Sequence, residues 1–302
     1  MNRRDFLKRL AGLSLGVSTL PLAFPKRVKG QVLAPITGMV GKGFLDIRVR
    51  TGLQAYKAQN PHHKIGELHC HSVYSDGYYS VDAILHRAAA LGLDFVVLTE
   101  HLMAGKYPLE SALESIKARR LCCERWQLKD VPPVSAYPAI EASTRQGHLL
   151  MVFPEEYLQP HNTRDIRKRF LDFEHSIPDI ETAARWTRSL GGVTVVPHPN
   201  KERSYPFGVS VPFIKQNLTG LLDGIEDISA AHGIHANHSA ELELAAIGSS
   251  DDHFNFLIGS AVTAYESPRH PDLIAAIRAR DTHAISINNS LGGVLATART
   301  LF

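Results

Sequence analysis

The sequence has little cysteine and no long run of purely apolar residues. Only three cysteines occur among 302 residues, so a disulfide framework is excluded and at least one thiol stays unpaired within the chain. No stretch reaches the roughly 20 apolar residues of a membrane-spanning helix, apart from a doubtful segment near the start. With 44% hydrophobic and 21% charged residues, the composition is that of a globular protein rather than a disordered or fibrous one.

The chain also lacks an excess of positive charge outside its first residues. Residues 1–30 contain seven Lys or Arg residues and one Asp, so their net charge is +6, whereas the net charge of the whole chain is +3. Residues 31–302 therefore carry −3. A protein that binds a nucleic-acid duplex usually concentrates Lys and Arg on its folded domain, so we expect no duplex binding.

The N-terminus has the pattern of an export signal. Arg3 and Arg4 are followed by Phe6-Leu7-Lys8 and by a modest apolar run, 10–24. The segment resembles the twin-arginine signal, RRxFLK, although Asn2 stands where Ser or Thr is usual. This resemblance implies export of the folded protein to the periplasm by the twin-arginine machinery.

Two other interpretations of residues 1–30 stay open. The segment could be an amphipathic first helix of the domain, although Pro21 and Pro25 end the apolar run. It could also be a retained membrane anchor, since Leu22-Ala23 and Lys29-Gly30 are both weak cleavage sites. We expect a mature chain without a stable membrane span, and a segment 1–30 that lies outside the globular domain.

Residues 31–60 are rich in glycine and weakly patterned, so we predict a linker or N-terminal extension with one strand-like run, 44–49. From residue 61 to 302, apolar strand-like runs alternate with helical stretches. The expected strands are 65–70, 93–99, 149–153, 193–196, 224–228, 245–249, 261–264 and 284–287. The expected helices are 80–91, 109–129, 164–174, 179–190 and 271–280.

Strands that alternate with helices of 10–15 residues are typical of α/β folds with parallel strand pairing. About seven such units over some 230 residues favour a distorted (β/α) barrel of about seven strands over an open sheet. No glycine-rich phosphate loop of the Rossmann or Walker kind follows any expected strand.

Histidines and carboxylates follow the expected strands repeatedly. His69 and His71 end the first strand, and residues i and i+2 of a strand share a face. Buried charge at strand ends is costly unless it is paired or bound to a metal ion. The pattern recurs at His101, Glu141, His148, His198, Asp251 and His253, and it therefore predicts a metal site at these strand ends.

The motifs HCHSVYSDG, TEH, GHLL, PHP and SDDH, with a lone Glu before GHLL, resemble in this order the PHP (polymerase and histidinol phosphatase) superfamily. The resemblance spans roughly residues 65–290 and implies a distorted barrel of about seven strands with three metal ions. It places the first ion on His69, His71, Glu141 and Asp251, and the second on the bridging Glu141, His148 and His198. It places the third on Asp76, His101 and His253.

Imidazole and carboxylate ligands suit divalent zinc, iron or manganese, and the sequence does not distinguish among these metals. The resemblance implies hydrolysis of a phosphomonoester or phosphodiester by a metal-bridging hydroxide, without a Ser or Cys nucleophile. The cations nearest in sequence that could bind the phosphate are Arg145, Lys201 and Arg203.

Residues outside these motifs receive simpler interpretations. We expect His232, His235 and His238 to lie on the surface of a loop or helix. Glu226 ends a strand and is a candidate to support a metal ligand through a hydrogen bond. We expect Cys122 and Cys123 to pack in the core, because adjacent cysteines seldom form a disulfide.

Three functions compete. The first is an exported metal-dependent phosphoesterase that acts on a small phosphorylated substrate. The second is a metal-dependent amide or ester hydrolase of the amidohydrolase type, since activated water serves both reactions. The third is a non-catalytic metal-binding module, which would be expected to have lost some of the nine ligands.

Overall fold

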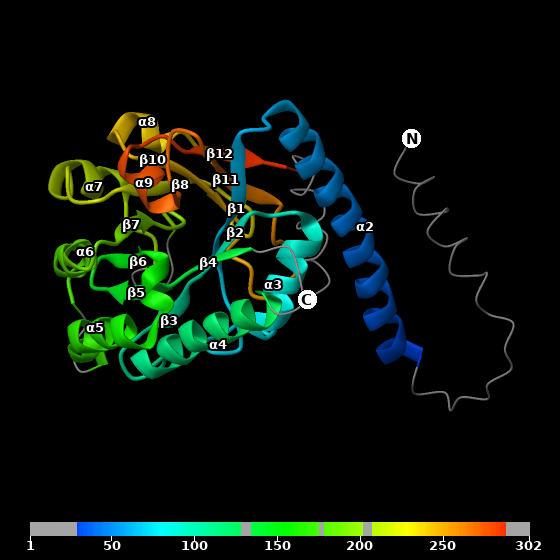
Figure 1. Cartoon of the computed structure of the whole chain (residues 1–302), viewed down its shortest axis with the longest axis horizontal. Helices are drawn as coiled ribbons and strands as arrows, with labels where there is room; N and C mark the ends of the chain where they lie inside the picture. The colour runs from blue at the N-terminus through cyan, green and yellow to red at the C-terminus, as the bar shows by residue number, and fades with distance from the viewer. Residues whose placement is uncertain (1–28, 128–133, 175–177, 202–206, 288–302) are drawn as a thin grey trace, which may run out of the picture. The chain divides into compact units, whose positions relative to one another are not determined.

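The computed structural model describes residues 29–127, 134–174, 178–201 and 207–287, without the side chains of 29–42 and 44 (Figure 1). The chain divides into two compact units, 1–45 and 46–302. Almost all of the predicted export signal, 1–28, lies outside the described residues. None of the described helices is both long enough and apolar enough to cross a membrane.

Helix α2 (Lys29–Gln59) occupies the segment that we predicted as a linker with a strand-like run. The strand prediction for 44–49 is therefore wrong. Val49 and Leu53 are both fully buried and lie four residues apart, which places them on one face of a helix. Burial of these two side chains on one helical face outweighs the local preference of β-branched residues for strand conformation.

The first sheet has five strands in the order β12-β11-β1-β2-β4. These strands are β12 (His283–Ser286), β11 (Ala261–Glu266), β1 (His63–Cys70), β2 (Phe95–Leu98) and β4 (Ser135–Tyr137). β1 pairs in parallel with β2 and antiparallel with β11. Strand β1, which ends at His69-Cys70, therefore lies in the middle of its sheet.

The second sheet has seven strands, six of them in the order β10-β8-β7-β6-β5-β3. They are β10 (Ala245–Ser249), β8 (Gly224–Ser229), β7 (Val193–Val196), β6 (Gly147–Val152), β5 (Ala139–Thr144) and β3 (Glu100–Leu102), and β9 (Ile234–His235) pairs with β8. All residues of β5, β6 and β7 are buried, as expected for strands covered on both faces.

The predicted α/β class is confirmed, but the strand pairing is mixed rather than wholly parallel. β5 and β6 form an antiparallel hairpin, and β6 is also antiparallel to β7. Within the described part of the chain, the hydrogen-bonded ladders form two sheets and do not close into one barrel. An isolated parallel bridge between Cys70 and Asp252 links the end of β1 to the loop after β10. The closed seven-stranded barrel stays a prediction.

The five helices that the sequence predicts are present, with bounds within four residues of those predicted, whereas two short helices at 211–217 and 238–242 were not predicted. Ser80 caps α3 (Val81–Leu91) through the amide of Ala83, and Gly92 ends it in the left-handed region at φ 85°. The others are α4 (Leu109–Gln127), α5 (Pro160–Phe170), α6 (Ile180–Ser189), α7 (Val211–Asn217), α8 (His238–Leu242), α9 (Leu273–Arg278) and the 3₁₀ helices η1 (Glu155–Leu158) and η2 (Leu171–Glu174).

The main hydrophobic core lies between the second sheet and the helices that cover it. In Figure 1, α6 lies beside β5 and β6, α4 lies beside β3 and β5, and α5 packs against α4. Phe153, Ile166 and Phe170 are fully buried in this core, with Phe173 and Trp186 packed against them. This packing fixes the strands whose ends carry the polar residues described next.

Candidate metal centre

The structure brings all nine predicted ligands together, and they form four overlapping groups within metal-binding distance of one another. Most lie at or just after the carboxyl end of a strand. His148 is an exception because it lies at the start of β6. Since β6 runs antiparallel to β5, its first residues lie beside the last residues of β5, at the same edge as the other ligands.

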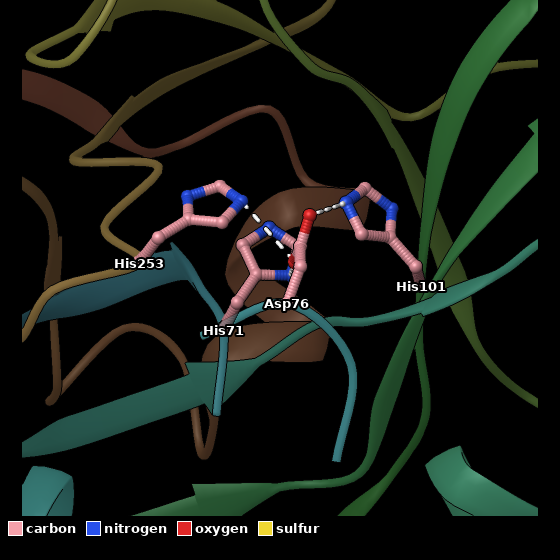
Figure 2. Close-up of side chains that lie close together, drawn as sticks. All are labelled: His71, Asp76, His101 and His253. Atoms are coloured by element: carbon pink, nitrogen blue, oxygen red, sulfur yellow. Dashed lines mark ion pairs between the residues drawn. The ribbon is translucent and has the colours of Figure 1, made fainter. Parts of the chain in front are cut away.

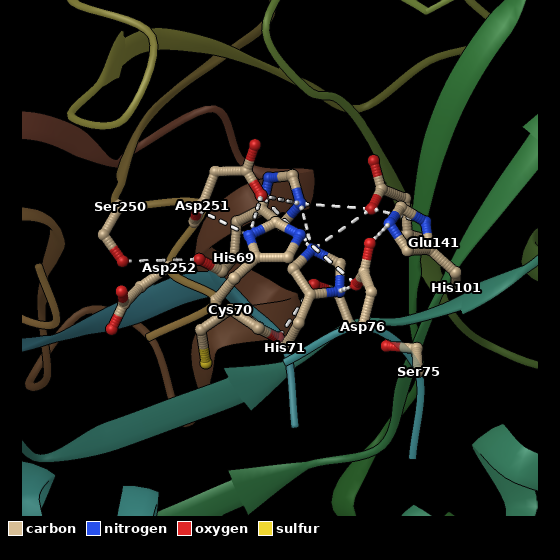
Figure 3. Close-up of polar contacts among 12 residues, drawn as sticks. His69, Cys70, His71, Ser75, Asp76, His101, Glu141, Ser250, Asp251 and Asp252 are labelled. Atoms are coloured by element: carbon tan, nitrogen blue, oxygen red, sulfur yellow. Dashed lines mark hydrogen bonds and ion pairs between the residues drawn. The ribbon is translucent and has the colours of Figure 1, made fainter. Parts of the chain in front are cut away.

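The first group surrounds two imidazole nitrogens that face each other. The Nε2 atoms of His69 and His71 are 3.1 Å apart. The Oδ1 atom of Asp251 lies 3.2 Å from both nitrogens, and the Oε2 atom of Glu141 lies 3.3 Å from both (Figure 3). Four donor atoms thus converge on one small space.

A second group is arranged around Asp76. Its Oδ2 atom lies 3.3 Å from Nε2 of His101, and its Oδ1 atom lies 3.2 Å from Nε2 of His253 (Figure 2). The ring of His71 stacks on both histidines, with centroids 4.5 Å from His101 and 4.3 Å from His253. These residues come from three loops or strands that are far apart in sequence.

Glu141 connects the groups because its two oxygen atoms face different histidines. Its Oε1 atom lies 2.6 Å from Nδ1 of His148 and 3.2 Å from Nε2 of His198. Its Oε2 atom faces His69, His71 and His101. This geometry is the one expected of a carboxylate shared by two cations.

The carboxylates and imidazoles perturb each other strongly. Burial raises the pKa of Glu141 and of Asp251, but the charges of neighbouring histidines outweigh burial and hold both pKa values well below their usual range. Conversely, burial lowers the pKa of His69, but Asp251 and Glu141 raise it well above its usual value. For His253 burial lowers the pKa, but the hydrogen bond with Asp76 and the charges of Asp251 and Asp76 together raise it to about 9. The cluster thus attracts positive charge.

The donor set fits divalent metal ions. Nδ1 of His71 and Nδ1 of His198 are buried without a hydrogen-bond partner, and an unpartnered buried nitrogen is costly unless something binds it. Nitrogen and carboxylate donors suit zinc, iron or manganese.

Two of the candidate ligands have a left-handed backbone, which is unusual for residues other than glycine. His198 has φ 30° and Asp251 has φ 51°. Such conformations cost free energy and concentrate at functional sites.

A glycine is required at position 77, because a Cβ atom there would lie 2.3 Å from the carbonyl oxygen of His71. This close approach folds the loop back so that Asp76 reaches the cluster.

Glu226, in β8, supports two of the histidines, as the sequence suggested it could. Its Oε1 atom lies 2.8 Å from Nδ1 of His69, and its Oε2 atom accepts a 2.7 Å hydrogen bond from the backbone amide of His198. The hydroxyl of Ser249 donates to the same carboxylate at 2.5 Å. Glu226 therefore fixes which nitrogen of His69 faces the cluster.

Glu100, beside His101, supports the loop that carries Asp76. Its carboxylate is fully buried and accepts hydrogen bonds from the hydroxyls of Ser72, Ser75 and Ser115. The carboxylate of Glu100 thus fastens this loop.

The expectation that His232 lies on the surface is wrong. Its side chain is only 10% exposed, and its Nε2 atom lies 2.6 Å from Oδ2 of Asp251. Its ring also packs beside that of His198. The spacing of three residues between His232, His235 and His238 suggested a shared helical face and obscured this role. The three residues in fact lie in a turn, in β9 and at the start of α8.

A cavity of about 690 Å³ opens over the cluster. It is lined by seven of the candidate ligands, by His232, and by Met103, Lys106, Tyr107 and Phe207. Phe207 stacks on His198 at a centroid distance of 4.1 Å, and Tyr107 stacks on His101 at 5.3 Å. The cavity thus has a polar, acidic floor and partly aromatic walls.

The predicted phosphate-binding cations lie elsewhere or outside the described residues. Lys201 donates from Nζ to the carbonyl oxygen of His232 at 3.0 Å and so anchors the turn that carries this histidine. Arg145 lies close enough to Asp179 to help lower the pKa of that carboxyl group. Arg203 lies outside the described residues. Among those that the structure does describe, Lys106 is the cation that lines the cavity, and sequence reasoning did not single it out.

Comparison with known proteins supports the resemblance. A family model described as PHP-associated matches residues 236–282. A solved two-domain protein from Bacteroides vulgatus ATCC 8482, containing a predicted PHP-like metal-dependent phosphoesterase, matches at 19% identity and a TM-score of 0.51 over 74% of this chain and 66% of that one. By this coverage, the chain spans somewhat less than two thirds of that protein's length. The similarity shows that the fold is PHP-like.

Two further structures are similar. PsfC from Pseudomonas syringae PB-5123 matches at 16% identity and a TM-score of 0.51, over 80% of this chain and 98% of PsfC. Endonuclease Q, in complex with a 27-mer duplex carrying an abasic lesion, matches at 17% identity and a TM-score of 0.44, over 68% of this chain and 53% of that one. This last likeness is too weak to bear on the predicted absence of duplex binding. No curated protein matches the chain.

Proposed function

We propose that the protein is a metal-dependent phosphoesterase that hydrolyses a small phosphomonoester or phosphodiester. The observation that carries the proposal is the convergence of nine imidazole and carboxylate side chains on the floor of an open cavity. Bound divalent ions would lower the pKa of a water molecule and stabilise the charge that develops on a phosphoryl group. We expect the groups centred on Asp76, Glu141 and Asp251 to hold two or three ions.

The residues around the cavity indicate that water is the nucleophile. Among the described residues that line it, none is Ser, Thr or Cys. The hydroxyls of Ser75 and Ser249 are committed to Glu100 and Glu226. Cys70 is fully buried against the carbonyl of Val97, and burial raises the pKa of its thiol well above the usual value. A covalent phosphoenzyme on these residues is therefore not expected.

Lys106 supplies the positive charge that the substrate needs beyond the metal ions. Its Nζ atom lies 4.6 Å from the ring centroid of Tyr107 at the edge of the cavity. From there a flexible ammonium group can reach an oxygen of a phosphate bound over the cluster. His232 holds Oδ2 of Asp251, so that Oδ1 stays directed toward His69 and His71.

The test is a panel of chromogenic phosphate mono- and diesters with carboxylic ester and amide substrates, assayed with added manganese, zinc or iron. We expect turnover of phosphate esters only. Hydrolysis in oxygen-18 water should place the label in the released phosphate, and a chiral phosphorothioate should react with inversion. Turnover of amides alone would favour an amidohydrolase, and retention of configuration would contradict direct attack by water.

We also propose that the protein is exported by the twin-arginine route. The support is the pair Arg3-Arg4, the Phe6-Leu7-Lys8 that follows it and the apolar run behind them. This route carries folded proteins, so the metal cluster can be assembled before export. Replacing Arg3 and Arg4 by Lys should retain the protein in the cytoplasm, as fractionation would show. Unchanged export of this double variant would refute the proposal.

A further inference from the structure

Two large aromatic side chains lie unusually exposed on the surface. Tyr78 is 70% exposed and Phe254 is 59% exposed, and their rings stack on each other with centroids 4.8 Å apart. Val73, 53% exposed, lies in the same loop as Tyr78. Contiguous exposed apolar surface of this kind on a folded protein marks a binding site more often than chance.

This aromatic pair lies beside the metal centre. Tyr78 follows Asp76 by two residues, so their Cα atoms are at most about 7 Å apart. Phe254 directly follows His253, and the side chains of Asp76 and His253 are paired at 3.2 Å. The two rings therefore rise from the same two loops that deliver the outermost candidate ligands.

The centre is open to solvent on this side. Asp76 is 32% exposed and His253 is 26% exposed, whereas the side chains of the other seven candidate ligands are at most 9% exposed. Asp76 and His253 also line the cavity over the cluster, so a substrate whose phosphate is bound there can extend outward past these two residues. The rest of the substrate would emerge next to the aromatic pair.

Backbone hydrogen bonds hold these loops in place. The amide of Tyr78 donates a 2.8 Å hydrogen bond to the carbonyl of His253, and the amide of Val73 donates a 3.0 Å hydrogen bond to the carbonyl of Tyr79. These backbone bonds fasten the loops whatever side chains they carry. The exposure of the rings thus calls for a role other than fastening.

We infer that Tyr78 and Phe254 form a platform that binds a planar aromatic group in the organic part of the substrate. This inference rests on the proposed phosphoesterase function. Aromatic rings bind flat ligands by offset stacking, and the outer faces of a preformed pair offer that surface without reordering the loops. The substrate class is therefore a phosphate ester whose organic part carries an aromatic ring.

The test measures binding without turnover. Phenylphosphonate and methylphosphonate, which carry the same anionic head, are titrated calorimetrically into manganese-loaded protein. We expect the wild type to bind phenylphosphonate about tenfold more tightly. The double variant Tyr78→Ala/Phe254→Ala should lose this preference while its affinity for methylphosphonate and its metal content stay unchanged. Tyr78→Phe should keep the preference, and Leu171→Ala, a 48% exposed apolar residue on η2, serves as the control.

The outcomes separate the two proposals. An unchanged preference for phenylphosphonate in the double variant would overturn the platform and leave the phosphoesterase proposal standing. An equal loss of affinity for both phosphonates would also overturn it, because it would show damage to the metal centre. If the loaded wild type binds neither phosphonate and hydrolyses no phosphate ester, the proposed function fails, and the platform fails with it.

Discussion

At the scale of single residues, the centre depends on side chains that hold other side chains. Glu226 orients His69, Glu100 fastens the loop of Asp76, and His232 orients Asp251. The contacts of Glu226 and His232 each leave one donor atom of the ligand directed toward the shared space. Residues in this supporting position commonly change metal affinity by 10- to 100-fold when they are replaced.

Replacing Glu226 by Gln should weaken metal binding by about 10- to 100-fold, because an amide has only one accepting oxygen and its NH2 group would face a donor, either His69 and Ser249 or the backbone amide of His198. The measurement is metal content per chain after dialysis against a graded series of chelator concentrations. Glu243→Gln is the matched control, since the side chain of Glu243 is 83% exposed. Equal retention by both variants would contradict the role of Glu226.

Replacing His69 by Ala should abolish most activity and remove at least one metal ion. His69 contacts Glu141 and Asp251 at the centre of the cluster. Elemental analysis and turnover of the chromogenic esters are the measurements, with circular dichroism as a check on folding. His235→Ala, at an exposed position in β9, should change neither quantity. A folded His69→Ala protein with full metal content would remove His69 from the ligand set.

At the scale of elements, the hairpin of β5 and β6 brings Glu141 and His148 to one edge of the sheet. A purely parallel arrangement would have placed the start of β6 at the opposite edge. Helix α6 covers this hairpin, and its first turn is capped by Asp179, whose carboxylate accepts from the amide of Thr182 at 2.7 Å. The cap therefore stabilises a helix that packs against the sheet carrying the metal centre.

Replacing Asp179 by Ala should lower the free energy of unfolding by about 1 kcal/mol at neutral pH. The hydrogen bond from Thr182 lowers the pKa of Asp179, so its stabilisation is present above the pKa of the unfolded chain and is lost as the pH falls through the lower, folded pKa. Urea unfolding at pH 7 and below pH 4 measures the difference, which should shrink in acid. Asp179→Asn should retain much of the cap, and a loss as large as that of Ala would contradict this account.

At the scale of the whole molecule, the two sheets meet where the ligands meet. Residues from both sheets and from the loops between them build one cluster, so bound ions would cross-link segments from His69 to His253. Without ions, the buried carboxylates depend on protonated histidines for compensation. Metal should therefore stabilise the fold as well as serve the reaction.

Removing the metal with a chelator should lower the Tm by about 5–10 °C. A ligand present at 100 times its Kd stabilises the native state by about 2.7 kcal/mol, and each kcal/mol shifts the Tm of a chain of this size by about 2–4 °C. Thermal unfolding followed by circular dichroism, with metal restored as the control, tests this. An identical Tm with and without metal would show that no ion cross-links the sheets.

The sequence by itself determined the elements with strong local patterns. The strands 193–196 and 245–249 were predicted to the residue, because each is a short apolar run that ends in turn-forming or polar residues. Helix α3 was predicted from its Ser80 cap and from Gly92. The nine histidines and carboxylates could be selected because they follow such strands and because their order resembles a known family.

Only the tertiary structure decided the features that depend on distant residues. The strand expected at 44–49 is helix, since burial of Val49 and Leu53 outweighs local propensity. The antiparallel hairpin that places His148, and the turn that directs His232 onto Asp251, follow from chain crossings that leave no periodic signal in the sequence. Lys106 reaches the cavity for the same reason: a loop's position in space is set by what its flanking strands pack against, and not by its own residues.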